Sequence, residues 1–448
     1  MKKLFGTDGI RGHAGEFPLD ESTVRAISLS LTRQFKDQLG RPSRFVTGRD
    51  TRESGDWIER AFHAGAREGG AECQSSGVIT TPGVAFVTKH FEFDAGIVIS
   101  ASHNPYDDNG IKIFAPDGKK VGEDIESAIE IEIRSLIPGA IVADHSPVED
   151  SKASEFQAAY SEHLADEFRG SQLAGFRMVV DCANGAASNL APQLFRRLGA
   201  EVIAVNDQPD GRNINKDCGS LHLEHLQSRV IAENANFGVG FDGDADRALF
   251  VDEKGNVVDG DATLWIMAQF LRAKGGLAND RVVATVMSNV GLEIALKSAG
   301  LNLVRTPVGD KYVLDELIRS GSELGGEQSG HVIFPKESLV GDGIMTALFM
   351  LEAIQQKAKP FSEMLKGFTR YPQVLVNVKV REKQPFESVS KISDAARQIE
   401  TQLDGGGRLL LRYSGTENLA RVMIEGKDQA EIERQANSLA DIIRTSLG

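Results

Sequence analysis

The sequence is poor in cysteine, lacks long apolar runs and carries no surplus of positive charge. Its three cysteines, Cys73, Cys182 and Cys218, lie far apart and form neither a CxxC pair nor a disulfide framework. A reducing cytoplasm is therefore the location we expect. No apolar run reaches the ~18 residues of a membrane span, and residues 1–8 lack the apolar core of a signal peptide. We accordingly expect no membrane partner.

The net charge of the chain argues against one class of ligand, the nucleic acids. The formal net charge is -14 at pH 7, whereas a nucleic-acid-binding protein usually carries a basic surplus. We therefore expect no nucleic-acid partner. A small anionic substrate stays open, because local basic loops can oppose the global sign. The 448 residues, 41% of them hydrophobic, are enough for roughly three or four domains with real cores.

A strand–helix–strand unit occurs three times along the chain. Each unit opens with a basic residue and an apolar run, passes through a helical stretch that ends at a glycine, and returns to a second strand. The openings are residues 44–46, 177–180 and 281–284, and the glycines are Gly70, Gly199 and Gly300. Glycine is typical just after a helix. Because βαβ units give parallel strands with crossover helices, the pattern predicts three related α/β domains with mixed sheets.

Further along each unit, a strand meets an unusual loop. The loops are residues 100–105, 242–247 and 325–331. Ligands of open α/β sheets gather beyond the strand ends, so we expect the three loops to face one central cleft. From about Tyr371 the pattern changes to alternating strands and a closing amphipathic helix over 428–447, which indicates a smaller C-terminal α+β domain. The predicted domains are residues 1–150, 151–256, 257–369 and 370–448.

Asp242, Asp244 and Asp246 are spaced by two, with small residues between them. Three carboxylates on a curling loop can converge on one cation, and hard oxygen ligands suit Mg²⁺ better than zinc or copper. A plain surface turn is the simpler alternative. An EF-hand loop is disfavoured because its central glycine is missing, Arg247 standing in that place.

Ser102 follows an apolar strand in the first loop and is the candidate nucleophile. Most loop serines only form turns or caps, but His103 beside it and Lys112 downstream add polar groups. A Ser-His-Asp hydrolase would need a Gly-x-Ser-x-Gly elbow. Ala101-Ser102-His103 does not supply one.

Two further loops carry binding groups. In the C-terminal domain, two hydroxyls, a glycine and flanking arginines predict an anion cradle rather than an incidental β-turn; these are Arg412, Ser414, Gly415, Thr416 and Arg421. In the third unit, Glu327 and Ser329 lie between glycines and could contact a sugar. His331 could be a proton carrier, a core histidine or neither.

Four motifs, taken in order, resemble those of the α-D-phosphohexomutase superfamily. They are Ser-Ala-Ser-His-Asn-Pro (100–105), Asp-Gly-Asp-Ala-Asp-Arg (242–247), Gly-Glu-Gln-Ser-Gly-His (326–331) and Arg-Tyr-Ser-Gly-Thr-Glu-Asn (412–418), and residues 5–12 also match the family's N-terminal signature. The resemblance covers essentially the whole chain. The form of the first motif and Gln328 in the third are most similar to the bacterial, amino-sugar branch.

This resemblance implies an enzyme that interconverts glucosamine 6-phosphate and glucosamine 1-phosphate on the route to UDP-N-acetylglucosamine. Ser102 would be a phosphoserine, and Ser102, Asp242, Asp244 and Asp246 would hold Mg²⁺. The substrate would pass through glucosamine 1,6-bisphosphate. Phosphomannomutase/phosphoglucomutase activity, a Mg²⁺-dependent phosphatase and a non-catalytic sugar-phosphate-binding regulator are the alternatives.

The remaining site residues have expected roles in charge and proton handling. Arg11, Lys112, His103 and Arg247 are candidates for stabilising charge on the travelling phosphoryl group. Glu327 and Ser329 would hold the sugar, and the loop from Arg412 to Arg421 the phosphate that does not react. Lys112 and His331 are both candidates for proton transfer, and the sequence does not choose between them. A homodimer is compatible with the sequence.

Overall fold

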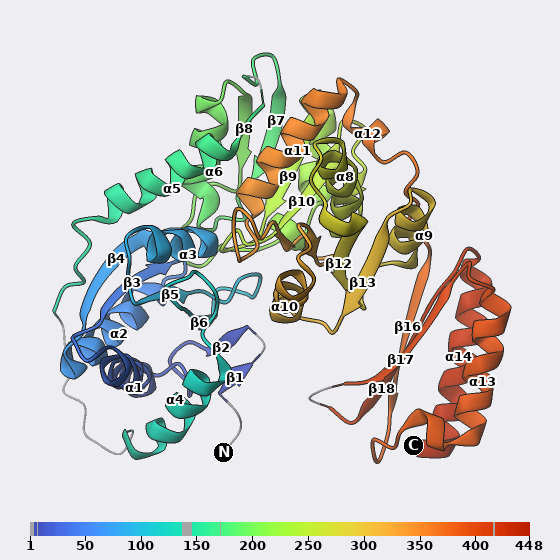
Figure 1. The fold of residues 1–448 in the computed structure, drawn as a ribbon, viewed down its shortest axis with the longest axis horizontal. Helices are drawn as coiled ribbons and strands as arrows, with labels where there is room; N and C mark the ends of the chain where they lie inside the picture. Colours follow the sequence, from blue (N-terminus) through green and yellow to red (C-terminus); the bar gives the residue numbers. More distant parts are fainter. Residues whose placement is uncertain (1–3, 7, 137–145, 171, 415–416) are drawn as a thin grey trace. The chain divides into compact units, whose positions relative to one another are not determined.

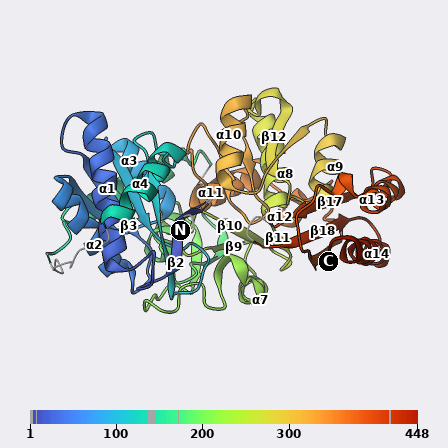
Figure 2. The same ribbon diagram turned by 90° about the horizontal axis from the view of Figure 1, so that it is seen from below.

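The computed structural model describes residues 4–6, 8–136, 146–170, 172–414 and 417–448. The chain divides into two compact units, which are considered one at a time (Figures 1 and 2). The first unit comprises Met1–Met287 and Leu303–Lys366. The C-terminal unit comprises Gly367–Gly448 together with a short earlier segment, Ser288–Asn302.

The first sheet has the strand order β1-β2-β6-β5-β3-β4. Its strands are β1 (Phe5–Gly6), β2 (Gly9–His13), β3 (Arg44–Arg49), β4 (Glu72–Val78), β5 (Ala95–Ile99) and β6 (Asp108–Phe114). Helices α1 (Glu21–Leu39), α2 (Gly55–Gly69), α3 (Thr81–His90) and α4 (Glu123–Leu136) accompany it. β5 is buried along its whole length, as expected for an apolar strand covered on both faces.

The second and third sheets have the orders β11-β10-β9-β7-β8 and β13-β12-β14-β15. The second contains β7 (Arg177–Asp181), β8 (Glu201–Val205), β9 (Phe237–Phe241), β10 (Ala248–Asp252) and β11 (Val257–Val258). The third contains β12 (Arg281–Thr285), β13 (Asn302–Thr306), β14 (Gly325–Gly326) and β15 (Val332–Ile333). Their helices are α5 (Ala153–Glu167), α6 (Ala187–Arg197), α7 (Glu224–Ala232), α8 (Gly260–Ala273), α9 (Val290–Ser298), α10 (Asp310–Ser320), α11 (Gly343–Lys357) and α12 (Phe361–Met364).

The three sheets share one topology, which confirms the predicted fold class of three related mixed α/β domains. The orders β6-β5-β3-β4, β10-β9-β7-β8 and β15-β14-β12-β13 correspond strand for strand. In each sheet the central strand pairs parallel with the third strand of the unit (β5, β9 or β14), which pairs antiparallel with the fourth. The loops that the sequence singled out are therefore the turns of three equivalent hairpins.

The glycines that mark the repeat have the expected backbone. Gly70, Gly199 and Gly300 lie just after α2, α6 and α9, with φ of 90°, 99° and 73°. These angles lie in the left-handed region, where a side chain is strained. The repeat could be recognised in the sequence because a glycine in this conformation is a common end signal of a helix.

In the C-terminal unit, helices cover one face of a three-stranded antiparallel sheet, ordered β16-β18-β17 (Figure 1). The strands are β16 (Gln373–Lys379), β17 (Arg408–Tyr413) and β18 (Leu419–Glu425), and the helices are α13 (Ser390–Leu403) and α14 (Gln429–Leu447). The predicted stripe of α14 is buried at Ile432, Ala436, Leu439 and Ile443. This is the small α+β domain expected from the sequence.

The segment around α9 belongs to the C-terminal unit through its contacts. Asn289 donates from Nδ2 to Glu425 Oε1 (3.1 Å) and to the carbonyl of Tyr371 (3.0 Å), and Oδ1 accepts from Tyr371 N (2.9 Å). Arg408 pairs with the same buried Glu425 at 2.8 Å and donates to the carbonyl of Ser288 (3.1 Å). A span between two strands of the third sheet is thus bonded into the C-terminal unit. The predicted domain boundaries stay predictions, although β11 carries the second sheet past the predicted boundary at 256.

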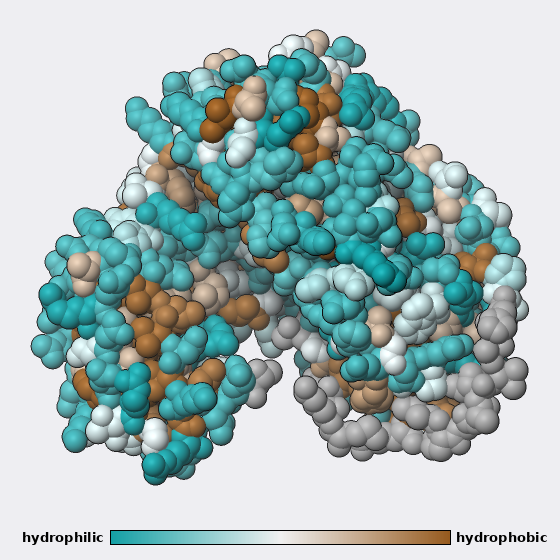
Figure 3. Space-filling model, turned by 180° about the vertical axis from the view of Figure 1, so that it is seen from behind, coloured by the Kyte–Doolittle hydropathy of each residue, from teal (hydrophilic) through white to brown (hydrophobic). Residues whose placement is uncertain are grey.

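The surface gives no sign of a membrane span. Across the described residues, no helix combines the length and apolarity needed to cross a bilayer. The face in Figure 3 is largely hydrophilic, with apolar side chains in separate patches.

Candidate active site

Ser102 lies in the turn that follows β5, with a backbone conformation rare for a residue other than glycine. Its φ is +53°, in the left-handed region. The side chain is buried, and its hydroxyl donates to Asp242 Oδ2 at 2.6 Å. Ser102 therefore connects the first hairpin loop directly to the second.

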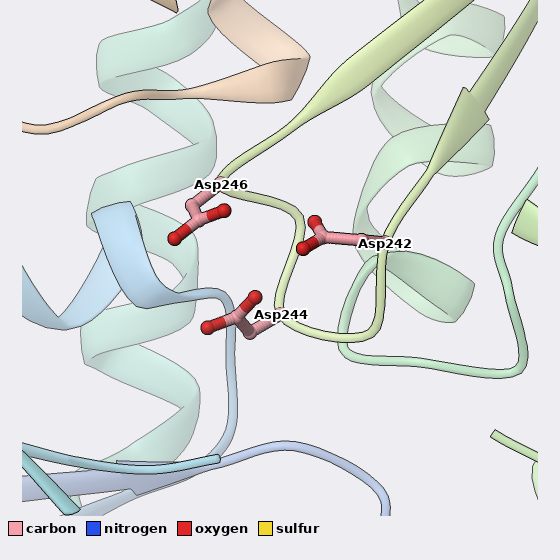
Figure 4. A group of neighbouring side chains, drawn as sticks. All are labelled: Asp242, Asp244 and Asp246. Atoms are coloured by element: carbon pink, nitrogen blue, oxygen red, sulfur yellow. The ribbon is translucent and has the colours of Figure 1, made fainter. Parts of the chain in front are cut away.

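The three aspartates converge on one point. Asp242, Asp244 and Asp246 stand on the turn between β9 and β10, and their carboxylates point into the same space (Figure 4). One oxygen from each lies within 4.8 Å of the others, and all three residues are buried. Oδ1 of Asp244 and Oδ1 of Asp246 are buried without a hydrogen-bond partner among the described residues. Buried acceptors of this kind need a partner, and a cation held by three carboxylates would supply it.

The electrostatics of the triad also favour a cation. Burial, together with the charges of Asp246 and Asp244, raises the pKa of Asp242 to about 8. Burial also raises the pKa of Asp246, but Lys112 and His331 outweigh it and hold that pKa well below its usual value. The cluster can therefore bind a metal ion, and its oxygen ligands fit a hard divalent cation.

An EF-hand arrangement does not form here. Glu253 stands at the twelfth position counted from Asp242, where an EF-hand has its bidentate glutamate. Its carboxylate instead accepts hydrogen bonds from the backbone N–H (3.0 Å) and hydroxyl of Ser362. β10 carries Glu253 away from the turn.

Lys112 is a buried cation between carboxylates. Its Nζ donates to Asp244 Oδ2 (2.9 Å) and Asp246 Oδ2 (3.2 Å) and lies 3.4 Å from Asp8 Oδ2. Burial lowers the pKa of Lys112, but the carboxylates, with Asp244 first, raise it well above its usual value. The lysine is therefore positively charged and suits charge stabilisation better than accepting a proton.

His331 and Arg247 flank the triad from the other side. His331 Nδ1 lies 3.5 Å from Asp246 Oδ1, while Nε2 lies 3.1 Å from the backbone N of Gly341 and 3.9 Å from Asp310 Oδ2. Both ring nitrogens thus face protein groups, which favours a positioning role for His331 over proton transfer. Arg247 donates its backbone N–H to Asp242 Oδ1 (3.2 Å), and its Nε lies 3.8 Å from Asp246 Oδ1.

His103 and Arg11 lie beside the serine. His103 Nδ1 is 3.3 Å from Ser102 Oγ, and burial, reinforced by Arg247 and Arg11, lowers the His103 pKa to about 4. The ring is therefore neutral near pH 7 and able to accept a proton. Arg11 pairs with Asp8, and its Nη1 is 3.5 Å from Asn104 Oδ1.

The third hairpin presents a carboxylate and a hydroxyl. Ser329 Oγ donates to Glu327 Oε2 (3.3 Å), and Gly309 N donates to Glu327 Oε1 (3.2 Å). Both side chains are partly exposed. The third hairpin lies beside the aspartate turn, because Gly330 O accepts from the backbone N–H of Ala248 (3.1 Å).

In the C-terminal unit, two arginines stand opposite each other. Arg412 on β17 and Arg421 on β18 are directly paired across the strands. Like charges in that position are unfavourable, and Arg421 adds to the burial that lowers the pKa of Arg412. Ser414 accepts from Lys383 Nζ through its carbonyl (2.7 Å). Gly415 and Thr416 lie outside the described residues.

Family comparisons bear on the same four regions. Profiles described as "Phosphoglucomutase/phosphomannomutase" match the chain as alpha/beta/alpha domain I over residues 2–137, domain II over 158–255, domain III over 259–371 and the C-terminal domain over 375–442. The chain belongs to the phosphoglucomutase/phosphomannomutase family. This membership confirms the resemblance to the phosphohexomutases and makes the protein an isomerase that transfers a phosphoryl group within its substrate.

Full-length relatives identify the branch of the family. A "Phosphoglucosamine mutase" from Solibacter usitatus is 48% identical over 447 residues, covering 100% of this chain and 99% of the relative. Other bacterial relatives at 44–46% identity carry the same name. The predicted bacterial phosphoglucosamine mutase branch is thereby confirmed.

Solved structures share the fold at low sequence identity. A phosphoglucomutase/phosphomannomutase family protein from Burkholderia thailandensis has a TM-score of 0.80 at 23% identity, with 100% of this chain and 99% of that one covered. An Aspergillus fumigatus N-acetylphosphoglucosamine mutase, solved "in complex with GlcNAc-6P and magnesium", has a TM-score of 0.67 at 21% identity, with 99% and 96% covered.

Several residues around the mutase site were not singled out from the sequence. Asp8 bridges Lys112 and Lys120, and Lys120 reaches on to Asp310 Oδ2 (2.6 Å). Thr81 donates from its hydroxyl to Asp244 Oδ2 (2.6 Å). The sequence did hold a signal that could have identified Asp8, since it lies in the same N-terminal signature as Arg11. Lys120, Asp310 and Thr81 had no such signal, because only folding brings Thr81 to Asp244 and brings Lys120 and Asp310 to Asp8 and to each other.

Proposed function

We propose that the chain interconverts glucosamine 6-phosphate and glucosamine 1-phosphate, with Ser102 as the phosphoryl carrier. The observation that carries this proposal is the direct hydrogen bond from the Ser102 hydroxyl to a buried carboxylate of the triad. Family membership supplies the reaction class, and the name shared by the full-length relatives supplies the amino sugar.

Asp242, Asp244, Asp246 and the phosphoserine would hold Mg²⁺. The orphaned oxygens of Asp244 and Asp246 fit a metal ion of this kind. When bound, the ion neutralises charge on the phosphoryl group. A phosphoserine brings about -1.5 to -2 charge, so the aspartates around it would repel it without positive charge nearby. Lys112, Arg247 and Arg11 supply further positive charge from the chain itself.

In the proposed step, the phosphoryl group passes from Ser102 to the substrate. The bond between phosphorus and Ser102 Oγ breaks while a bond forms from phosphorus to the free hydroxyl oxygen of the sugar phosphate, giving glucosamine 1,6-bisphosphate. The proton of that hydroxyl has to reach Ser102 Oγ. Neutral His103, with Nδ1 3.3 Å from Oγ, is placed to relay it. The bisphosphate then turns, and its other phosphoryl group returns to Ser102 by the reverse chemistry.

The remaining contacts would hold the sugar and the phosphate that does not react. Glu327 and Ser329 can accept from and donate to ring hydroxyls or the amine. The facing pair Arg412 and Arg421 supports an anion site, because guanidinium groups bind phosphate oxygens in pairs. The cytoplasmic location and a homodimer stay predictions.

A substrate comparison tests the assignment. Purified protein is given glucosamine 6-phosphate, glucose 6-phosphate and mannose 6-phosphate at equal concentration, and the 1-phosphates are measured by ³¹P NMR. We expect the highest kcat/KM for glucosamine 6-phosphate. A preference for mannose or glucose phosphate would replace the amino-sugar assignment with the phosphomannomutase/phosphoglucomutase alternative.

A second measurement tests the carrier. Intact-mass analysis should find one phosphoryl group on the wild-type protein after incubation with the bisphosphate and none on Ser102→Ala, which should fold but lack mutase activity. Turnover by Ser102→Ala would refute the phosphoserine mechanism. Net release of inorganic phosphate without isomerisation would instead favour a phosphatase.

A further inference from the structure

The backbone of Ser102 needs support that its own sequence does not provide. A non-glycine residue with φ of +53° is strained, and such a conformation persists only when the surrounding structure holds it. The loop itself contributes two bonds, from Ser102 N to Ser100 Oγ (2.9 Å) and from Asn104 N to Ala101 O (3.1 Å). The carbonyl groups of Ser102 and Asn104 instead accept from side chains that lie far away in the sequence.

Two side chains donate to the same pair of carbonyl oxygens. Asn215 Nδ2 donates to Ser102 O (2.9 Å) and Asn104 O (3.0 Å). Arg52 Nη2 donates to Asn104 O (2.6 Å) and Ser102 O (3.3 Å), and its Nε reaches Pro105 O (3.4 Å). Arg52 follows β3 of the first sheet, whereas Asn215 comes from the second domain, between β8 and α7.

The arginine is itself fixed. Its side chain is fully buried and pairs with the equally buried Asp50. Asp50 Oδ1 also accepts the backbone N–H of Arg52 (2.9 Å), and Asp50 N donates to Ile99 O at the end of β5 (3.2 Å). A buried guanidinium whose charge is balanced in this way is a rigid donor, because neither partner can move without leaving a charge unpaired.

Packing closes the remaining side of the loop. A Cβ placed on Gly243 would lie 2.6 Å from Ser102 O and 3.0 Å from Asn215 Nδ2. The carbonyl of Ser102 therefore lies directly against the aspartate turn, between Asp242 and Asp244. The carbonyl and the hydroxyl of Ser102 thus both contact this turn, the hydroxyl through its bond to Asp242 Oδ2.

We propose that Arg52 and Asn215 are positioning residues that hold Ser102 in its left-handed conformation and so aim its oxygen at the metal-binding triad. This inference rests on the proposed role of Ser102 as phosphoryl carrier. The two side chains bind backbone carbonyls, so their loss should lower the rate of phosphoryl transfer and leave substrate affinity nearly unchanged. A misplacement of about 1 Å can cost about 100-fold in rate.

Asn215→Asp and Asn215→Ala are the test variants, because Asn215 is only partly buried. Asn215→Asp leads, since Asn215 has a φ of +58°, which aspartate tolerates better than alanine. Asn215→Asp keeps the size and removes the N–H donor. We expect kcat to fall by about tenfold to 100-fold with KM within about twofold. The rate at which the bisphosphate phosphorylates Ser102, followed by intact mass, should fall in parallel.

Asn213→Ala is the matched control. Asn213 lies in the same segment and bonds within it, through Nδ2 to Gln208 O (2.9 Å), without contacting the serine loop. It should keep wild-type kcat even if it lowers the melting temperature. Arg52→Lys keeps the positive charge but loses the guanidinium group that donates to several carbonyls at once. The folded variant should show the same fall in kcat as Asn215→Asp.

The outcomes separate the two proposals. If Ser102→Ala is inactive but the Asn215 variants keep wild-type kcat, the positioning role is wrong and the proposed function stands. Equal losses in Asn213→Ala and Asn215→Ala would also overturn it, because they would trace the effect to the stability of the segment. If Ser102→Ala is active, the proposed function itself has failed.

Discussion

Replacing Lys112 with methionine tests, without any catalytic assay, whether the triad needs a positive charge for stability. Lys112 is 1% exposed and lies 2.9 Å from Asp244 Oδ2, 3.2 Å from Asp246 Oδ2 and 3.4 Å from Asp8 Oδ2. Methionine keeps most of the side chain and removes the charge, so the buried carboxylates of Asp244 and Asp246 and the partly exposed one of Asp8 lose a shared cation. Breaking a buried ion pair from one side typically costs about 3–5 kcal/mol. We expect a loss of that size in the stability of the first unit, in the presence of EDTA.

Magnesium should then restore part of the lost stability. A ligand at about 100 times its Kd stabilises the folded state by about 2.7 kcal/mol. In Lys112→Met the carboxylates have no competing ammonium, so Mg²⁺ should raise the unfolding midpoint more in the variant than in the wild type. The assay is urea unfolding followed by tryptophan fluorescence, with EDTA or with Mg²⁺. Both tryptophans, Trp57 and Trp265, lie in the first unit and report on it alone.

Lys120→Met is the control for this experiment. Lys120 is also a largely buried lysine and pairs with Asp8 and Asp310, but the described structure gives it no contact with the triad. It should lose stability without selective rescue by Mg²⁺. Equal rescue of the two variants, or an unchanged midpoint for Lys112→Met, would refute the triad as a cation site balanced by Lys112.

Three further changes have defined outcomes. Gly243→Ala places a Cβ 2.6 Å from Ser102 O, so we expect a loss of about 1–3 kcal/mol by overpacking and a lower kcat; a variant with wild-type kcat would contradict the tight contact. Burial raises the pKa of Asp342 to about 6, above its ordinary 3.8, so its contribution to stability is greatest at low pH and is lost as pH rises through about 6. Asp342→Asn should therefore gain stability on the wild type as pH rises from about 4 to about 6, by up to about 3 kcal/mol, and should keep that gain at higher pH, in thermal melts; a pH-independent difference would speak against this origin. Arg421→Ala should raise KM for the sugar phosphate with a smaller change in kcat, and steady-state kinetics showing an unchanged KM would remove Arg421 from the phosphate site.

The fold could be predicted from the sequence because its signals are local. Each repeat can be recognised by an apolar strand and by a glycine just after a helix, as at Gly70, Gly199 and Gly300. The hairpin loops could be aligned from the same pattern, which placed Ser102 and the aspartates in equivalent turns. The closing helix was predicted from its apolar stripe, and the structure adds a cap, Asp428, whose side chain accepts from Glu431 N.

The supporting residues could not be predicted, because their partners are far away in the sequence. Asn215 donates to Ser102 O, 113 positions away in the sequence. Lys120 pairs with Asp310, 190 positions away. The sequence did not choose between Lys112 and His331 for proton transfer. The choice depends on whether the lysine amine and the histidine ring nitrogens are already bonded to other protein groups. That is a property of packing, as the contact between Gly341 N and His331 Nε2 illustrates.

The interruption of the third sheet by residues of the C-terminal unit has a consequence for how this protein can be divided. The polypeptide passes between the two units at 287/288, 302/303 and 366/367. A fragment starting at Gly367 would leave Glu425 and Arg408 without Asn289 and Ser288. No single cleavage releases the C-terminal unit intact, so gene fusion or domain exchange at one junction would damage both products. A fragment that carries the C-terminal unit of this chain therefore needs residues 288–302 as well.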